Sequence, residues 1–348
     1  MPATTINSIC ILRLSALGDI SHTLPVFHTI RKERPNTKIT WIIGKAEYEL
    51  VKGLENVEFI TFDKKSGFNS YRDIRKKLKN RKFDVLLHMQ MSLRASLISL
   101  LIKAKIKIGF DRKRAKDAQW LFSNKKIKYQ PNQHVIDSFF GFTQAIGITQ
   151  RHYQWDIPVS NQEVKNLDNI FQARKKYIII SPCSSKAYRN WSVEGYSTIA
   201  DYINENYNMD IVLSGGNSEI EQHYAKEIMA LTHCTPINLI GKTTIKELLH
   251  ILKNAEFVIS PDSGPAHLAT TVQTPVIGLY ATTNPDRARP YLSAETTVNK
   301  YPEAVLKKYH KPVSELTWGT RVRDEWAMKM ITINDVKCIV DKLINKIS

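Results

Sequence analysis

Short apolar runs alternate with longer amphipathic stretches along most of the chain. In the first half, the apolar runs predict strands at 8–14, 38–43, 57–62, 83–89 and 105–110. Residues 15–19 between the first run and the next amphipathic stretch are typical of a turn, and helical patterns follow at 20–34, which Pro35 ends, and at 93–102. Such alternation predicts a parallel sheet with helices on both faces.

A polar stretch at 156–176 interrupts this pattern, and the same alternation then begins again. The apolar runs of the second half predict strands at 177–181, 210–213, 257–260 and 275–280. We therefore expect an α/β protein with two doubly wound, Rossmann-like domains that face each other across a cleft, where the carboxyl ends of such strands bind ligands. The expected parts are 1–160, 161–330 and a C-terminal helix at 331–348, capped by Thr332 or Asn334 and free to pack back on the first domain.

The composition is that of a folded protein, with 43% hydrophobic and 24% charged residues among 348. No apolar run approaches the roughly 20 residues of a membrane span. Arg13 and Asp19 interrupt the apolar N-terminal stretch, so we expect neither a signal peptide nor a transmembrane helix, and we expect a cytoplasmic protein. The 4 cysteines are far apart in sequence, and no His pair has the spacing of a zinc site, so neither disulfides nor a metal centre is expected.

Positive charge is concentrated in the first half. Residues 1–150 carry 27 Lys and Arg against 12 Asp and Glu, whereas residues 151–348 carry 23 against 21. The clusters lie at 72–82, 103–116 and 125–128. This asymmetry indicates an anionic partner, which could be nucleic acid, an anionic membrane surface or a phosphate-bearing substrate; a solvated lysine-rich surface is the alternative.

The turns that follow the strands of the second half carry candidate chemistry. After the strand at 257–260, Gly264 lets the backbone approach a ligand and Pro265 suits a first helical position. The free N–H groups and dipole of such a helix favour an anion, although an ordinary capped helix has the same pattern. The turns after three strands together supply hydroxyls, cations and carboxylates at Ser184, Ser185, Lys186, Arg189, Gly215, Gly216, Glu219, Asp262, Ser263, Gly264 and His267.

Hydroxyls, Lys or Arg, and helix N-termini suit a diphosphate, and a carboxylate such as Glu219 suits ribose hydroxyls. Neither G-x-x-x-x-G-K-[ST] nor G-x-G-x-x-G occurs at these turns, so an ordinary P-loop or dinucleotide site is excluded.

Three motifs resemble the lipopolysaccharide heptosyltransferases of glycosyltransferase family 9. They are Arg-Leu-Ser-Ala-Leu-Gly-Asp-Ile at 13–20 with Thr-Leu-Pro at 23–25, the stretch at 184–191, and Asp-Ser-Gly-Pro-Ala-His at 262–267. The resemblance spans about 8–292. It implies a GT-B fold in which an N-terminal acceptor domain and a C-terminal donor domain transfer heptose from ADP-heptose to the Kdo of lipid A, with inversion, no cofactor and no required metal.

The same resemblance implies a role for individual residues. Asp19 falls where the family keeps its proposed base, and Arg189 stands where close relatives have Lys. The donor residues implied are Ser184, Ser185, Lys186, Arg189, Glu219, Asp262, Ser263, Gly264 and His267, and the acceptor residues are Lys64, Lys65, Arg94, Arg112 and Arg114. For Asp19, a helix N-cap is the alternative interpretation, and for Arg94 it is an ordinary surface arginine.

The chemistry is consistent with these assignments. One aspartate can accept a proton from a sugar hydroxyl, and a single displacement inverts the anomeric carbon, whereas retention would need a second nucleophilic carboxylate. The expected partners are an ADP-sugar, a Kdo–lipid A acceptor and, peripherally, the anionic cytoplasmic face of the inner membrane of a Gram-negative cell. The alternatives are a family 9 enzyme for another inner-core sugar or donor, a GT-B-like nucleotide-sugar epimerase, and a nucleic-acid-binding module, for which the chain lacks an aromatic-interleaved basic strand.

Overall fold

The computed structural model describes residues 6–173 and 175–347, and the chain divides into two compact units, Met1–Pro158 and Val159–Ser348. The division falls inside the polar stretch at 156–176, two residues before the expected end of the first domain at 160. Residues 1–5, 174 and 348 belong to the expected domains but lie outside the described residues.

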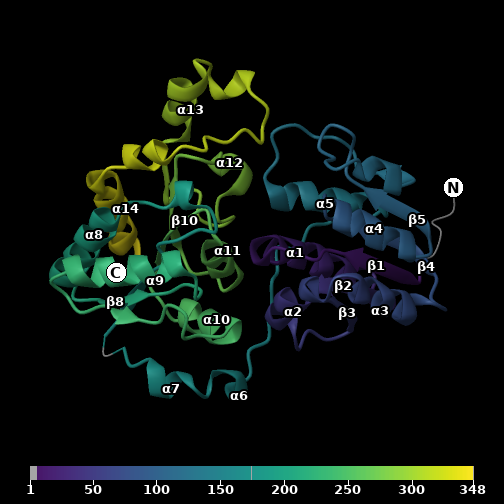
Figure 1. The fold of residues 1–348 in the computed structure, drawn as a ribbon, viewed down its shortest axis with the longest axis horizontal. Helices are drawn as coiled ribbons and strands as arrows, with labels where there is room; N and C mark the ends of the chain where they lie inside the picture. The colour runs from purple at the N-terminus through teal and green to yellow at the C-terminus, as the bar shows by residue number, and fades with distance from the viewer. Residues whose placement is uncertain (1–5, 174, 348) are drawn as a thin grey trace. The chain divides into compact units, whose positions relative to one another are not determined.

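The first unit is built on a parallel sheet with the strand order β3-β2-β1-β4-β5-β6 (Figure 1). Its strands are β1 (Ser8–Leu12), β2 (Lys38–Gly44), β3 (Val57–Phe62), β4 (Phe83–His88), β5 (Ala104–Gly109) and β6 (Lys125–Lys126). Its helices are α1 (Leu17–Glu33), α2 (Lys45–Val51), α3 (Phe68–Leu78), α4 (Leu93–Leu101) and α5 (Val135–Ala145), with 3-10 turns η1 (Lys64–Ser66) and η2 (Gln119–Phe122).

Helices cover both faces of this sheet, as a buried parallel sheet requires. On one face, Cys10 of β1 belongs to the same apolar cluster as Ile74 of α3 and Ile98 of α4. On the other face, Phe27 of α1 packs against Trp41 of β2, with ring centroids 6.1 Å apart. The strands predicted for this half are therefore confirmed, with ends shifted by at most two residues. The turn expected at 15–19 is wrong in part, because α1 begins at Leu17.

The second unit repeats this plan with the strand order β12-β11-β10-β7-β8-β9, again parallel. Its strands are β7 (Tyr177–Ile180), β8 (Asp210–Leu213), β9 (Ile237–Asn238), β10 (Val258–Pro261), β11 (Val276–Tyr280) and β12 (Thr297–Asn299). Its helices are α6 (Asn161–Val164), α7 (Leu167–Ile170), α8 (Val193–Tyr207), α9 (Glu219–Leu231), α10 (Ile245–Lys253), α11 (Gly264–Thr271), α12 (Pro285–Ala288), α13 (Tyr301–Tyr309) and α14 (Ile333–Ile347), with 3-10 turns η3 (Ala187–Arg189), η4 (Val313–Glu315) and η5 (Glu325–Met330).

The C-terminal helix α14 packs within the second unit. Val336 and Val340 belong to the apolar cluster that also contains strand residues of β7, β8, β10 and β11. Thr332 caps the helix, since its Oγ1 accepts a hydrogen bond from the backbone N–H of Asp335 at 3.1 Å. The apolar face of α14 is thus buried in the core of the second unit, and packing of this helix on the first domain stays a prediction.

Both sheets change the direction of strand order at one place, between β1 and β4 in the first unit and between β7 and β10 in the second. At such a switch point the loops that leave the carboxyl ends of the two strands diverge and open a crevice for ligands. The loops after these strands are therefore the places to look for a site. Within the part of the chain that the structure describes, no helix has both the length and the apolar character needed to cross a bilayer.

Candidate active site

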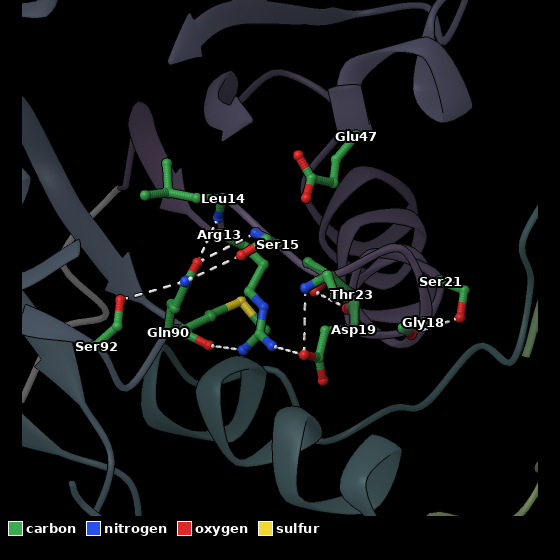
Figure 2. A network of polar contacts seen from close by, with 12 residues as sticks. Arg13, Leu14, Ser15, Gly18, Asp19, Ser21, Thr23, Glu47, Gln90 and Ser92 are labelled. Atoms are coloured by element: carbon green, nitrogen blue, oxygen red, sulfur yellow. Dashed lines mark hydrogen bonds and ion pairs between the residues drawn. The ribbon is translucent and has the colours of Figure 1, made fainter. Parts of the chain in front are cut away.

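Asp19 lies in the first turn of α1, just beyond the carboxyl end of β1, with 39% of its side chain exposed. Its carboxylate forms an ion pair with Arg13, whose Nη1 also donates to the carbonyl oxygen of Met89 at 2.5 Å (Figure 2). The Arg13 side chain is only 8% exposed, and its guanidinium lies 5.3 Å from the ring centre of Phe139. A buried, well-anchored guanidinium therefore holds a carboxylate that a ligand can still reach.

The structure does not support the interpretation of Asp19 as a helix N-cap. The N-cap of α1 is Ala16, and Asp19 is the third residue of the helix. The Asp19 carboxylate accepts a hydrogen bond from the backbone N–H of Ala16 only at 3.4 Å, which is long for a bond of this type. Its strongest contact is with Arg13, so the carboxylate is not committed to the helix end.

Gln90 fastens the loop after β1 to the loop after β4. Its Oε1 accepts from the backbone N–H groups of Leu14 at 2.6 Å and Ser15 at 3.2 Å, and its Nε2 donates to Ser92 Oγ at 3.2 Å (Figure 2). Ser92 in turn is the N-cap of α4. Gln90 and Arg13 were not among the predicted site residues, although Gln90 directly follows a buried strand at the switch point, which is the signal that could have found it.

A buried carboxylate, Glu47 of α2, lies close to the same loop (Figure 2). A Cβ atom on Gly44 would fall 2.1 Å from Glu47 Oε2 and 2.4 Å from the carbonyl oxygen of Leu14, so this close approach requires glycine. Lys64 Nζ donates to Glu47 Oε1 at 3.0 Å. Lys64, expected to contact the acceptor, is therefore paired with a carboxylate that lies beside the loop between β1 and α1.

The other predicted acceptor residues differ in how strongly they are held. Lys65 is exposed in η1, where its backbone N–H donates to Asp63, and Arg94 is exposed at the second position of α4. Arg112 is exposed and lies 4.7 Å from the ring centre of Trp120. These three cations are accessible to an anionic ligand.

Arg114 is held much more tightly. Its guanidinium pairs with Asp111 and donates to Gln133 Oε1 at 3.0 Å, to Ser138 Oγ at 2.8 Å and to the carbonyl oxygen of Lys128 at 3.0 Å. A side chain with so many partners holds its own loop in shape. We therefore assign it a supporting role for the loop that presents Arg112.

In the second unit, three predicted donor residues come together at the switch point. Arg189 Nη1 lies 3.1 Å from Asp262 Oδ2, and His267 Nε2 lies 3.5 Å from Asp262 Oδ1. The side chains are nearly buried, at 12% exposure for Arg189 and Asp262 and 9% for His267. Burial alone would raise the pKa of Asp262, but the hydrogen bond from His267 and the charge of Arg189 bring it below its ordinary value. Asp262 is therefore a stable anion that orients the two side chains.

The N-terminus of α11 lies directly beside these residues. Ser263 is its N-cap and its Oγ is 2.7 Å from Ser260 Oγ. Nothing lies within 4 Å of where a Cβ on Gly264 would be, so the helix start is open on this side. An open helix start of this kind could hold an anion through its first N–H groups and the positive end of its dipole, and the anion site stays a prediction.

The loop after β7 runs next to this cluster and leads into η3. Ser184 is buried, and its backbone N–H donates to Asn190 Oδ1 at 2.7 Å, whereas Ser185 and Lys186 are exposed. Lys186 is the N-cap of η3, three residues before Arg189. The loop thus holds one serine in its backbone framework and leaves a hydroxyl and an ammonium group accessible.

Backbone N–H groups at the Gly-Gly turn after β8 are bound by the side chain of a residue that was not predicted, Glu221. Glu221 Oε1 accepts from the backbone N–H of Gly216 at 2.6 Å, and Glu221 Oε2 accepts from that of Ser218 at 3.1 Å. Glu221 therefore completes the capping box of α9. The predicted residue, Glu219, is exposed at the first position of α9, where its carboxylate is accessible.

A protein-family comparison identifies the chain. The model of glycosyltransferase family 9 (heptosyltransferase) matches residues 71–318, which include all the donor turns described above. The chain belongs to this family. It is accordingly an enzyme, a glycosyltransferase of the heptosyltransferase family, and the predicted resemblance is confirmed. The matched residues begin after Asp19, so the family model does not test the loop that follows β1.

Individual family 9 proteins support this conclusion. The lipopolysaccharide core heptosyltransferase OpsX of Haemophilus influenzae is 42% identical over 330 residues, which is 95% of each chain. A family 9 glycosyltransferase structure from Veillonella parvula superimposes with a TM-score of 0.80 at 20% identity, covering 99% of both chains. The E. coli heptosyltransferase WaaC, solved with ADP, gives a TM-score of 0.72 at 18% identity over 97% of this chain and 99% of that one. The fold is therefore of the GT-B type, as predicted.

A metal centre was not expected from the sequence. Across 6–173 and 175–347, no three or more His, Cys, Asp or Glu side chains are grouped closely enough to hold a metal ion.

Proposed function

We propose that this family 9 enzyme transfers heptose from ADP-heptose to the Kdo of lipid A during assembly of the lipopolysaccharide inner core. The 42% identity to OpsX over nearly the whole chain supports a lipopolysaccharide core substrate. The observation that carries the proposal is the buried Arg189–Asp262–His267 cluster beside the open start of α11.

The donor site proposed here lies on the second unit. Arg189 keeps its Nε buried and without a hydrogen-bond partner in the described structure, so its guanidinium has donor capacity that Asp262 does not use. Together with Lys186 and the N–H groups at the start of α11, it would neutralise the diphosphate as the bond between sugar and phosphate breaks. Ser185 and Ser263 supply hydroxyl groups beside it, and Glu219 offers a carboxylate to the ribose.

In this proposal, Asp19 is the general base. Its carboxylate takes the proton of the attacking Kdo hydroxyl while the hydroxyl oxygen bonds to the anomeric carbon of heptose and ADP departs with the bonding electrons. One base and one displacement invert the anomeric configuration. Arg13 pairs with Asp19 directly and Gln90 holds the loop that leads into α1, so the base is positioned before the acceptor binds.

The acceptor is proposed to bind the basic first unit. Lys65, Arg94 and Arg112 are exposed cations on that unit, and Lys64 is paired with Glu47 beside the loop that leads into α1. Phosphate and carboxylate groups of a Kdo–lipid A acceptor are anionic, which suits these side chains. The proposed place of work is the cytoplasmic face of the inner membrane, where such an acceptor is anchored, and the proposed reaction needs no metal or cofactor.

A direct test is to incubate the purified enzyme with ADP-heptose and lipid A acceptors that carry one Kdo, one phospho-Kdo or two Kdo units. A mass increase of one heptose, with one ADP released per product, is the expected result. The same experiment separates the alternatives. Release of ADP that occurs without any acceptor would indicate a hydrolase or epimerase-like activity, and turnover only with a heptose-bearing acceptor would indicate a later step of core assembly.

A further inference from the structure

Helix α4 presents leucines to the outside of the first unit. Leu93, Leu97 and Leu100 are 57%, 43% and 61% exposed. Their spacing of four and then three residues places them along one side of the helix. Two serines of the same helix, Ser96 and Ser99, have no exposed surface at all. An ordinary surface helix has polar residues on its exposed side, whereas the exposed side of α4 carries leucines.

The buried residues on the inner side of α4 are sufficient to orient the helix on the sheet, without the three leucines. Ala95, Ile98 and Ile102 lie in the apolar cluster with Ile74 and Leu78 of α3. The buried serines fit because Ser99 Oγ donates to the carbonyl oxygen of Ser96 at 2.6 Å. The fold of this unit therefore does not require leucine at the three outer positions, where exposing polar residues to water would cost less free energy.

The exposed apolar surface continues onto the neighbouring turn η2, which contacts α4. Leu121 of η2 is 63% exposed. We call Leu93, Leu97, Leu100 and Leu121 the leucine face. An apolar surface of this kind, on a folded unit with its own complete core, indicates a binding surface rather than a packing error.

Exposed cations lie on α4 and on the segments next to it. Arg94 lies on α4 itself, Lys103 follows its end, and Arg112 stacks on Trp120 of η2. Helix α3, which packs beside α4, adds exposed cations at Arg72, Arg75, Lys76 and Lys77. The unit as a whole has a strong positive excess, whereas the second unit is almost neutral.

We propose that the leucine face and its basic rim seat the first unit on an anionic lipid bilayer. Leucines that enter the boundary between headgroups and acyl chains, with cations beside them at the level of the lipid phosphates, are the two components of interfacial binding. A protein partner would need a patterned acidic rim around an apolar cleft, whereas a bilayer offers apolar depth and negative charge everywhere. At 9 residues, α4 is far too short to cross the bilayer and would lie on it.

Binding of α4 to a lipid surface would bring the enzyme to its acceptor, and only this purpose rests on the proposed function. The N-cap of α4, Ser92, is hydrogen-bonded to Gln90, which holds the loop that leads into α1 and so to Asp19. A helix of this length is about 14 Å long, so a lipid surface under α4 lies within about one helix length of the proposed base. An acceptor anchored in the same bilayer would then need only its sugar to reach Asp19.

The test measures binding to vesicles of phosphatidylglycerol and phosphatidylethanolamine, and separately to phosphatidylcholine, by co-sedimentation of the full chain. The test variant is Leu93→Gln, Leu97→Gln and Leu100→Gln together; glutamine keeps a helix propensity close to that of leucine. The matched control replaces three leucines of the second unit with similar exposure, Leu231, Leu292 and Leu306, at 50%, 53% and 56%. We expect the test variant to bind anionic vesicles about 100-fold more weakly, because each leucine has about half of its surface left to bury, and the control to bind like the wild type.

Turnover of a delipidated, water-soluble Kdo acceptor should be unchanged in the test variant, which separates this inference from the proposed function. If the wild type also fails to turn over this acceptor, the result contradicts the proposed function and leaves the lipid-binding inference standing. Wild-type binding of the test variant to anionic vesicles would overturn the inference. So would a finding, by sedimentation velocity, that the substitutions abolish self-association and leave vesicle binding unchanged, because the leucine face would then join two copies of this chain.

Discussion

Replacement of Asp19 by asparagine tests the proposed base with little change of shape. The amide has the size of the carboxylate, and its oxygen can still accept hydrogen bonds from Arg13 and from the backbone N–H of Ala16, but it cannot take up the proton of a sugar hydroxyl. We expect kcat to fall about 10²- to 10⁴-fold, the usual contribution of general base catalysis. ADP affinity should stay within about twofold, because the proposed donor residues are all in the second unit.

The cost of this substitution in folding stability should be small. The ion pair between Arg13 and Asp19 is lost, but Asp19 is 39% exposed, so the pair is partly screened by water. Arg13 keeps its hydrogen bond to the Met89 carbonyl and its contact with Phe139. A loss on the order of 1 kcal/mol, or a few degrees in Tm, follows from replacing a charged hydrogen bond by a neutral one. A much larger fall in kcat therefore cannot be attributed to unfolding.

The assay is ADP release with saturating ADP-heptose and Kdo–lipid A acceptor, with ADP affinity measured by calorimetry and Tm by circular dichroism. Asp73→Asn serves as the control, since Asp73 is an exposed carboxylate on α3 in the same unit. If Asp19→Asn kept kcat within about threefold of the wild type while ADP binding and Tm were normal, Asp19 would not be the base. Its role would then be limited to its ion pair with Arg13.

Four further outcomes are expected. Arg112→Gln should raise the acceptor KM and weaken the dependence of KM on salt, with no change in Tm. Arg114→Gln should mainly lower Tm, because the Arg114 guanidinium donates hydrogen bonds to several residues of its loop. Equal effects of the two substitutions on KM would contradict the assignment of acceptor binding to Arg112 and loop support to Arg114. Arg189→Gln should weaken ADP binding about tenfold or more in calorimetry and leave the acceptor KM unchanged; unaltered ADP affinity would remove it from the donor site. Burial, with the nearby charge of Lys107, lowers the pKa of His88 to about 4, whereas an unfolded histidine titrates near 6.5. As pH falls, the unfolded chain therefore takes up this proton before the folded protein does. The free energy of unfolding, which has its full value above pH 6.5, should decrease by about 2 kcal/mol between pH 7 and pH 5. His88→Leu should remove this part of the decrease, as measured by urea titrations at the two pH values. Chelation with EDTA should leave turnover intact, and loss of activity that magnesium or manganese restores would show that a metal, and not Arg189, neutralises the leaving diphosphate.

Much of the fold could be predicted because buried parallel strands are nearly continuous apolar runs bounded by turn residues. The run at 57–62 and the strand Val57–Phe62 coincide for this reason. The start of α1 was missed because neither Ala16 nor Gly18 signals a helix start: alanine has no side-chain acceptor for a cap, and glycine is a poor helix former. Strands of two residues such as β6 and β9 contain no apolar run, so only their neighbours in the sheet define them.

The candidate site was predictable where its residues directly follow strands. Asp262 and His267 were found in this way, but their pairing with Arg189, 73 residues earlier than Asp262, depends on β7 and β10 being neighbours in the sheet. Glu221 could have been found from the sequence, since Ser218 and Glu221 form the S-x-x-E pattern of a capping box. Gln90 could have been named as a candidate from its place after a buried strand at the switch point, but its role of bonding two loops that are 75 residues apart is visible only in the structure.

Under the proposed function, the two units use the same topology for complementary chemical roles. At the switch point of the first unit, a buried guanidinium is anchored by a backbone carbonyl and an aromatic ring, and the group left accessible is the Asp19 carboxylate. At the switch point of the second unit, the buried anchor is the Asp262 carboxylate, and the groups left with donor capacity are Arg189 and the start of α11. Glycosyl transfer to a hydroxyl needs a proton acceptor on the attacking side and positively charged groups beside the departing diphosphate. Under the proposed function, the first unit supplies the proton acceptor and the second unit supplies the positive charge, and in each unit an ion pair at the switch point fixes the orientation of the group concerned.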